Sequence, residues 1–585
     1  MSVVPVAVRA QDQNDTQQGI EYEPKIEGLE GSLKDTAEES LNLFRLKDRR
    51  PSSLPALRAR LDADLEIVDK ILKSEGYYGY RIDHRIDATQ KPVSVLLTVD
   101  PGTAYKLTRY DIHYLDAEAG SKLPADLKKI GITLGDPARA ETIVNAQSKL
   151  IRQLGEQGHP YATVEDRTVL VHHADKTVTV ALEVRAGPAT TFGPITVTGN
   201  ERVEDAYIVR LADLRQGDTF NLSKMDDARR RLFGTNLFDT VTINRPQTFP
   251  GQPQLPVTIE VKEKDRRSVG LGGFYSTTEG AGVEASWTHR NLFGQGERLE
   301  LGTRVAEREL SAFADFLKPN VGRLDQNITA RSDLKREDTD AYDQSSFANT
   351  VGVQRKLSDH WKGSLAAAFE TSRIRETDNP PAQEYLIVGF PAQLAYDGSN
   401  DLFDPSEGVR MTFDASPNQV FGDSTARFLL ASVIGSTYHE VWPNKRVVLA
   451  ARGHVASLLG AEVDDIPASR RLYAGGGGSI RGYDYQSVGP LDANNKPTGG
   501  RSLVEMSFEA RIRITDTIGV VPFVDGGSAS EDKFPATDSF QWAAGLGLRY
   551  YTPIGPLRFD VAFPLDRRPG IDDTYAIYVS LGQAF

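Results

Sequence analysis

The 585-residue chain contains no cysteine. This absence excludes disulfide bonds, thiolate chemistry and cysteine-ligated zinc or iron–sulfur sites. A long apolar segment is lacking too, because no stretch approaches the roughly 20 apolar residues that a membrane-spanning helix needs. The sequence therefore excludes a helical membrane protein, but it does not exclude a membrane barrel, whose strands carry a much weaker signal.

The chain also has no net positive charge. The formal net charge is −13, whereas a nucleic-acid-binding face is basic. The sequence has no zincin pattern, nucleophile elbow or Walker loop, and its nine histidines are scattered. We therefore expect no nucleic-acid partner, no enzymatic activity, no catalytic residue, no cofactor and no metal site.

The first residues, MSVVPVAVRAQDQ, hold a short apolar run from Val3 to Val8, and the segment AVRA then ends in a small residue, Ala10, before a polar stretch. This pattern is typical of the end of a secretory signal peptide. A disordered apolar N-terminus is the alternative. Residues 1–21 are accordingly assigned to a signal-peptide remnant and a disordered lead.

Three related segments follow, at 72–82 (LKSEGYYGYRI), 151–164 (IRQLGEQGHPYATV) and 230–243 (RRLFGTNLFDTVTI). In each, a helical pattern ends at a glycine, the usual residue just past a helix, and a β-prone run comes next. Alternating strands open and close each unit, with a period of about 75 to 85 residues. The pattern predicts three small α+β domains, at 22–102, 103–188 and 189–265.

Residues 266–585 have a different texture, with alternating segments separated by Gly, Asp, Asn and Pro. In SLVEMSFEARIRI, for example, Val504 and Phe508 share one face, while Glu505 and Glu509 share the other. The second face carries opposite charges and glycines, which suits a barrel lumen. At about 20 residues for each strand with its loop, the region predicts 16 strands. A large soluble sandwich array remains the alternative.

The stretch GGGGSIRGYDY, at 475–485, combines four glycines with a single arginine. A phosphate-binding loop needs a lysine and a following helix, and this stretch has neither. A surface hairpin with an incidental arginine is the other alternative.

These segments resemble a known family. The N-terminal units resemble POTRA domains, and SIRGYDY, VPFVDGG and GLGLRYYTPIGPLRFDVAFPL, with RNLFGQGERLEL and DLFDPSEGVRM, resemble the bacterial surface-antigen, or BamA-like, superfamily. Three POTRA units before a barrel look most like TamA-type translocation and assembly factors. The resemblance implies three α+β POTRA domains in the periplasm, followed by a 16-stranded antiparallel transmembrane β-barrel in the bacterial outer membrane.

The resemblance also implies a contact between a loop and the barrel wall. In this superfamily the Arg-Gly-aromatic motif lies on a loop after the eleventh strand that folds back into the barrel, where its arginine meets an acidic residue. The matching positions are Arg481, Gly482 and Tyr483 on the loop, and Phe523, Asp525 and Glu509 on the wall. Arginine binds a carboxylate with two hydrogen bonds, and glycine permits the sharp turns that such a loop needs.

A lateral seam is expected where the first and last strands of the barrel meet. The expected residues are Gly270, Leu271, Gly272 and Gly273 on the first strand, and Val579, Leu581 and Phe585 on the last. Because glycine weakens strand pairing, this seam is a candidate for lateral opening. A permanently closed seam is the alternative.

The function that the resemblance implies is assembly of outer-membrane proteins, with autotransporters and other β-barrel chains as substrates. The implied partners are a TamB-like protein that spans the periplasm, the substrate chains and outer-membrane lipid. A free strand edge on each POTRA sheet favours docking, with simple spacing as the alternative. A BamA-type general insertase, a two-partner secretion channel and a passive anchor are the alternative functions.

Overall fold

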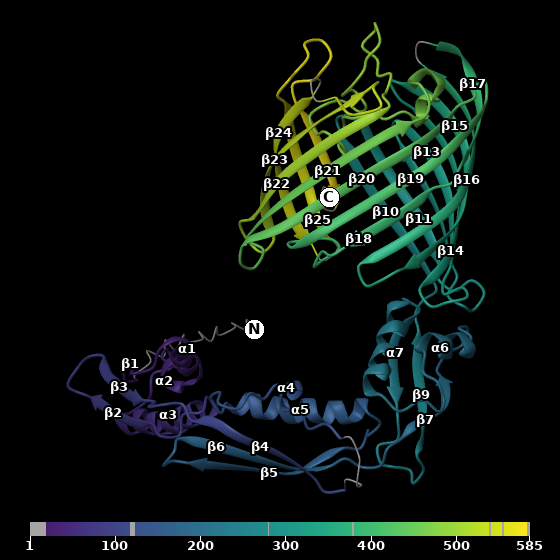
Figure 1. Cartoon of the computed structure of the whole chain (residues 1–585). Coiled ribbons are helices and arrows are strands. Elements are labelled where there is room, and N and C mark those ends of the chain that lie inside the picture. The colour runs from purple at the N-terminus through teal and green to yellow at the C-terminus, as the bar shows by residue number, and fades with distance from the viewer. Residues whose placement is uncertain are drawn as a thin grey trace, which may run out of the picture. The chain divides into compact units, whose positions relative to one another are not determined.

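The computed structural model describes residues 19–116, 123–278, 280–376, 379–536, 540–552 and 555–581. It contains three small α+β domains and a closed β-barrel (Figure 1). Within the described ranges, no helix has the length and apolar character needed to cross a bilayer. Most of the predicted signal-peptide remnant, residues 1–18, lies outside the described residues.

The first domain has a three-stranded sheet in the order β1-β3-β2. Its elements are β1 (Tyr22–Glu27), α1 (Gly31–Ser40), α2 (Asn42–Arg45), α3 (Leu54–Ser74), β2 (Arg81–Asp87) and β3 (Val93–Asp100). One face of α3 is buried at helical spacing, through Leu57, Leu61, Val68 and Leu72, in the same core as alternate residues of β3. An amphipathic helix thus covers one face of a short sheet.

The second and third domains repeat this topology, with sheet orders β4-β6-β5 and β7-β9-β8. The second contains β4 (Lys106–Tyr114), α4 (Leu127–Ile130), α5 (Ala140–Glu156), β5 (Thr163–His172) and β6 (Thr177–Arg185). The third contains β7 (Thr191–Thr198), α6 (Asp205–Ala212), α7 (Leu222–Gly234), β8 (Phe238–Asn244) and β9 (Gln254–Glu263). All these elements fall within the three predicted domain ranges.

The last strand of each domain is the central one. It runs parallel to the first strand, as in β1–β3 and β4–β6, and the second strand pairs with it antiparallel in the first two domains. Isolated bridges at Pro137 and Thr219 touch the outer edges of β4 and β7. No such bridge is found on β2, β5 or β8 in the described ranges, so the second strand of each sheet offers the free edge that was expected.

The predicted glycine stops lie where the long helices end, with one difference in the third domain. Gly76 and Gly158 follow α3 and α5 with φ of 90° and 100°, in the left-handed region that glycine tolerates. Gly234 is instead the last residue of α7, and Asn236 takes the left-handed conformation with φ of 59°. Asparagine adopts this conformation more readily than other non-glycine residues.

The C-terminal region forms one closed antiparallel barrel (Figure 1). Its first half contains β10 (Arg267–Ser276), β11 (Gly280–His289), β12 (Arg298–Ala306), β13 (Glu309–Lys318), β14 (Gln326–Asp338), β15 (Tyr342–Lys356), β16 (Trp361–Glu376), β17 (Asn379–Gly389) and β18 (Ala392–Asp397). Its second half contains β19 (Gly408–Gly422), β20 (Arg427–Trp442), β21 (Val447–Leu459), β22 (Ser502–Arg513), β23 (Ile518–Ser530), β24 (Gln541–Thr552), β25 (Gly555–Pro564) and β26 (Ala576–Leu581).

These segments make 16 strands, because β17 and β18 are two parts of one strand. Both pair with β16 on one side and with β19 on the other. The break falls at Phe390 and Pro391, and proline has no N–H group to donate to a ladder. The predicted strand number is confirmed, and the closed ladder excludes the soluble sandwich array.

The alternation predicted for the C-terminal strands is also confirmed. Phe508, Leu548 and Phe559 are exposed on the outer surface of the barrel, whereas Glu509 and Arg549 are buried. In a soluble protein this arrangement would be inside out. A barrel in lipid turns its apolar face outward and its charged face toward the lumen.

Candidate functional site: a loop bound inside the barrel

The loop between β21 and β22 follows the eleventh barrel strand and packs into the lumen. It contains two short 3₁₀ helices, η1 (Val463–Asp465) and η2 (Ala468–Arg470). Further along, Ile480, Tyr483 and Val488 are buried in one cluster with wall residues, namely Ala456, Leu503, Ala529 and Ala543. The Gly-rich stretch is therefore not a surface hairpin.

Glycine is required at the tip of this loop for two reasons. Gly475, Gly476 and Gly482 have φ of 106°, 100° and 103°, which a residue with a side chain rarely adopts. A Cβ atom on Gly482 would also lie 3.1 Å from the Cβ of Ala543 on β24. The glycines thus allow the backbone to turn sharply against the barrel wall.

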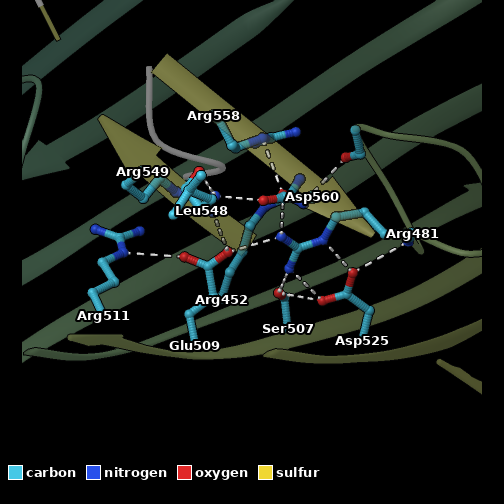
Figure 2. Close-up of polar contacts among 11 residues, drawn as sticks. Arg452, Arg481, Ser507, Glu509, Arg511, Asp525, Leu548, Arg549, Arg558 and Asp560 are labelled. Atoms are coloured by element: carbon cyan, nitrogen blue, oxygen red, sulfur yellow. Dashed lines mark hydrogen bonds and ion pairs between the residues drawn. The ribbon is translucent and has the colours of Figure 1, made fainter. Parts of the chain in front are cut away.

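Arg481 is only 2 % exposed and is bound by three carboxylates (Figure 2). Its Nε and Nη2 donate to the two oxygens of Asp525, at 2.7 and 2.9 Å, so this contact is bidentate. Its Nη1 donates to Glu509 at 2.9 Å and to Asp560 at 3.1 Å. Ser507 completes the site by accepting from Nη2 at 3.3 Å and donating to Asp525 at 2.6 Å.

The ring of Phe523 lies against the guanidinium of Arg481, with 3.5 Å between Cζ and the ring centroid. Phe523 shares a strand face with Asp525, and both side chains point into the lumen, where they are buried. A cation–π contact of this kind contributes about 0.5 to 2 kcal/mol. The predicted inward aromatic residue on β23 is therefore present.

Further arginines surround the acidic groups (Figure 2). Arg511 Nε donates to Glu509 at 3.1 Å, Arg549 Nη1 donates to Asp560, and Arg558 Nε lies 3.1 Å from Asp560. Together with Arg481 they give four guanidinium groups against three carboxylates. Because each of these charges is out of contact with bulk water, its stability depends on its partners in the cluster.

Two glycines in β24 make room for this cluster. A Cβ atom on Gly545 would collide with the ring of Phe523, and one on Gly547 would collide with Asp560 and Arg549. The glycines on the lumen face of GLGLRY are thus explained by close packing.

The loop tip also touches the last strands of the barrel. The Gly482 N–H donates to the hydroxyl of Tyr578 on β26 at 3.0 Å. The hydroxyl of Tyr483 donates to the carbonyl of Trp542 on β24 at 2.8 Å. Tyr483 therefore has a specific contact with the wall, beside the pair that Arg481 forms.

A second set of contacts holds the Gly-rich stretch above the arginine. The Gly475 N–H donates to Ser479 Oγ at 2.9 Å, and Ser479 in turn donates to Glu505 on β22. Glu505 lies 3.1 Å from His454 Nδ1 on β21. At the base of the loop, Arg471 pairs with Glu376 on β16 at 3.0 Å.

The seam between β10 and β26 is described as far as Leu581 of β26. Among the described residues it has two ladder pairs, Tyr275 with Val579 and Ser276 with Tyr578. Two hydrogen bonds between Thr277 and Ile577, both 3.0 Å long, extend it. By contrast, β25 pairs with β26 at all six of its described positions, Ala576–Leu581.

The predicted seam residues are placed differently from one another. Gly270, Leu271, Gly272 and Gly273 pair with β11, and the ladder among the described residues pairs none of them with β26. Val579 lies opposite Tyr275, which is four residues, or about 13 Å, along the strand from Leu271. Among the described residues, Leu581 pairs with Leu557 of β25. Phe585 lies outside the described residues.

Several site residues were not predicted: Asp560, Arg511, Arg549, Arg558, Ser507 and Tyr578. A signal for most of them is present in the strand alternation, which puts Ser507 and Arg511 on the face of Glu509 and puts Arg549, Arg558 and Asp560 opposite their apolar neighbours. Their contact with the loop tip could not be predicted, because it depends on how the closed barrel brings these strands together.

A closed barrel with a loop bound in its lumen, preceded by three α+β domains, defines the class of POTRA-containing outer-membrane barrels. The Omp85 superfamily domain matches residues 291–585, just over half of the chain, and the chain belongs to this superfamily. The POTRA model described as a surface antigen variable number repeat matches 190–264, and the one described as TamA domain 1 matches 23–101. The barrel is thus an outer-membrane barrel with periplasmic POTRA domains, as predicted.

The chain is similar to proteins named outer membrane protein assembly factor BamA. One from Nitratidesulfovibrio vulgaris is 24% identical over 546 residues, covering 90% of this chain and 68% of the relative. One from Neisseria meningitidis is 20% identical, covering 89% of this chain and 72% of the relative. The crystal structure of Haemophilus ducreyi BamA lacking POTRA domains 1–3 matches the fold with a TM-score of 0.69 and 19% identity, covering 82% of this chain and all of that one.

Proposed function

We propose that this chain is an assembly factor that helps β-barrel proteins, autotransporters in particular, into the outer membrane through its lateral seam. The observation that carries the proposal is the β10–β26 ladder, which has two pairs among the described residues, whereas β25 pairs with the same stretch of β26 at six positions. The relatives named outer membrane protein assembly factor support the general function.

The proposed mechanism uses the edge of β10 that faces away from β11. From Arg267 to Phe274 this strand has no described partner on its outer side. When the seam opens, a substrate hairpin can add to this edge by backbone hydrogen bonding. An unpaired edge is costly in lipid, so the incoming strand is stabilised as soon as it pairs.

Within the superfamily we assign the chain to the TamA type, with a TamB-like partner on its POTRA domains. Three POTRA domains and the match of 23–101 to TamA domain 1 support this assignment. The BamA-type general insertase is the second candidate, and the names of the relatives favour it. A secretion channel is disfavoured, because the loop is bound inside the lumen against β22, β23, β24 and β26.

A disulfide across the seam tests the mechanism. The chain has no cysteine of its own. Tyr275→Cys and Val579→Cys lie directly opposite each other, within the reach of a disulfide. We expect the oxidised protein to lose assembly of barrel substrates and to regain it after reduction, measured in vesicles with an autotransporter and a porin-type substrate.

The matched control bonds the same β26 residue to its other neighbour. Phe559→Cys with Val579→Cys joins β25 to β26 and leaves the seam free, so this variant should keep its activity when oxidised. Full activity of the sealed 275–579 barrel would disprove lateral opening. Equal activity on both substrates would favour the BamA-type over the TamA-type assignment.

A further inference from the structure

Tyr578 belongs to the loop site and to the seam at the same time. Its backbone pairs with Ser276 across the seam, in one of the two described ladder pairs. Its hydroxyl accepts a hydrogen bond from the Gly482 N–H at the loop tip. Gly482 is itself buried, so its N–H group has no access to bulk water when Tyr578 moves away.

The surroundings of Tyr578 join it to Arg481 as well. Tyr578 packs in a buried cluster with Phe523, Ala562 and Ala576, and Phe523 is the residue whose ring lies against Arg481. On β25, Asp560 lies directly opposite Tyr578 in the ladder and accepts from Arg481 Nη1 at 3.1 Å. The loop tip is therefore bound to β25 and β26, the last two strands of the barrel.

We infer that Tyr578 couples the loop to the seam, so that the bound loop holds β26 closed and release of the loop favours opening. This regulation rests on the proposed function, because it concerns the same seam. Opening separates Tyr578 from Ser276 and displaces its hydroxyl from Gly482. Since the open state loses this buried hydrogen bond, the loop contact favours the closed state. Coupling of this kind is reciprocal, so a sealed seam must also hold the loop.

The test measures opening directly, without a substrate. Ser276 is buried and lies at the seam, so a thiol in the variant Ser276→Cys is shielded while the seam is closed. The rate of maleimide labelling of the full chain in vesicles then reports the open population. In this background we expect Tyr578→Phe, which removes only the hydroxyl, to increase the labelling rate by about 5- to 10-fold. Arg481→Ala should increase it at least as much.

Tyr483→Phe is the matched control. It also removes one hydroxyl between loop and wall, but the lost contact is to Trp542 on β24, away from the seam. We expect its labelling rate to rise by less than that of Tyr578→Phe, because it weakens the loop contact with β24 and leaves the hydrogen bond to β26 in place. Heat-modifiable migration in gels verifies that each variant has a folded barrel.

Two results would overturn the coupling: an unchanged labelling rate in Tyr578→Phe, or the same increase in Tyr578→Phe and Tyr483→Phe. The reciprocal measurement is protease cleavage of residues 475–490, which the 275–579 disulfide should slow. The labelling assay is independent of assembly activity. If labelling responds while the sealed barrel stays active, the coupling stands and the proposed function fails.

Discussion

Arg481 and Asp525 are not equivalent in their dependence on each other. Asp525 is bound by Arg481 and Ser507, whereas Arg481 also reaches Glu509 and Asp560. Removing the arginine leaves the buried carboxylate of Asp525 without a cationic partner. Removing Asp525 leaves the arginine with two other acidic partners. The loop contact is thus stronger than one ion pair, and its loss depends on which side is changed.

We expect Arg481→Ala to cost roughly 3 to 5 kcal/mol locally and to release the loop without unfolding the barrel, whose ladder closes without it. Asp525→Ala should also weaken the loop contact, and by less. The double variant should cost less than the sum of the two single substitutions, because neither charge of the pair is then left buried without its partner. Arg481→Lys should restore the loop contact only in part, since an ammonium group cannot form the planar, bidentate pair with Asp525 that a guanidinium forms.

The measurement for these variants is protease accessibility of residues 475–490 from outside the cell, together with assembly activity. Strictly additive effects of the two alanine substitutions would contradict the buried pair. A loop that is already cleaved in the parent protein would do the same.

Among the elements outside the membrane, the end of β9 is held by a single carboxylate. Glu263 accepts hydrogen bonds from the backbone N–H groups of Glu201, Arg202 and Val203, at 2.9, 2.8 and 2.8 Å. Partial burial raises the pKa of Glu263, but these three donors outweigh it and hold the pKa below its usual range. The ionised side chain thus ties β9 to the turn that follows β7.

This contact predicts a pH dependence of the third POTRA domain. Because the folded pKa is depressed, the stabilisation is fully present above the unfolded pKa, about 4.3, and is lost as pH falls through the folded pKa. Glu263→Gln should therefore lower the stability of the domain near neutral pH by about 1 to 2 kcal/mol and change little in acid. Hydrogen exchange of residues 201–203 in the full chain measures both. An equal loss at pH 3 and pH 7 would contradict the ionised contact.

At the scale of the whole molecule, the first two POTRA domains have cores of their own, separate from the barrel. The first domain buries its own cluster, which contains no barrel residue, and the barrel is closed by its own ladders. Stability of the barrel should therefore not depend on the first domain.

Deletion of residues 22–102 should accordingly leave a heat-modifiable barrel while weakening co-purification of a TamB-like partner. Loss of the barrel in this variant would contradict separate folding. If partner binding is unchanged, the first domain is a spacer, and the docking edge must be sought on β5 or β8.

The sequence by itself determined the periodic features of this protein. Helix-period segments that end at Gly76 and Gly158, and strands that alternate between Phe508-type and Glu509-type positions, follow from local sterics and from the solvent on each side of an element. The number of strands, the three domains and the inward direction of Arg549 and Asp560 could be predicted for this reason. The motif around Arg481 led to Asp525 and Glu509 only through family resemblance, since nothing local shows which distant strand an arginine meets.

Only the tertiary structure decided the register of the seam and the composition of the charged cluster. Register is fixed by how far each strand is displaced along its neighbour around the closed barrel, a quantity that no single segment encodes. The structure therefore placed Val579 opposite Tyr275 instead of the glycine stretch, and it brought Tyr578 and Asp560 to the loop tip. The contacts of the loop tip join residues up to 96 positions apart in the chain, and they exist only because the barrel closes.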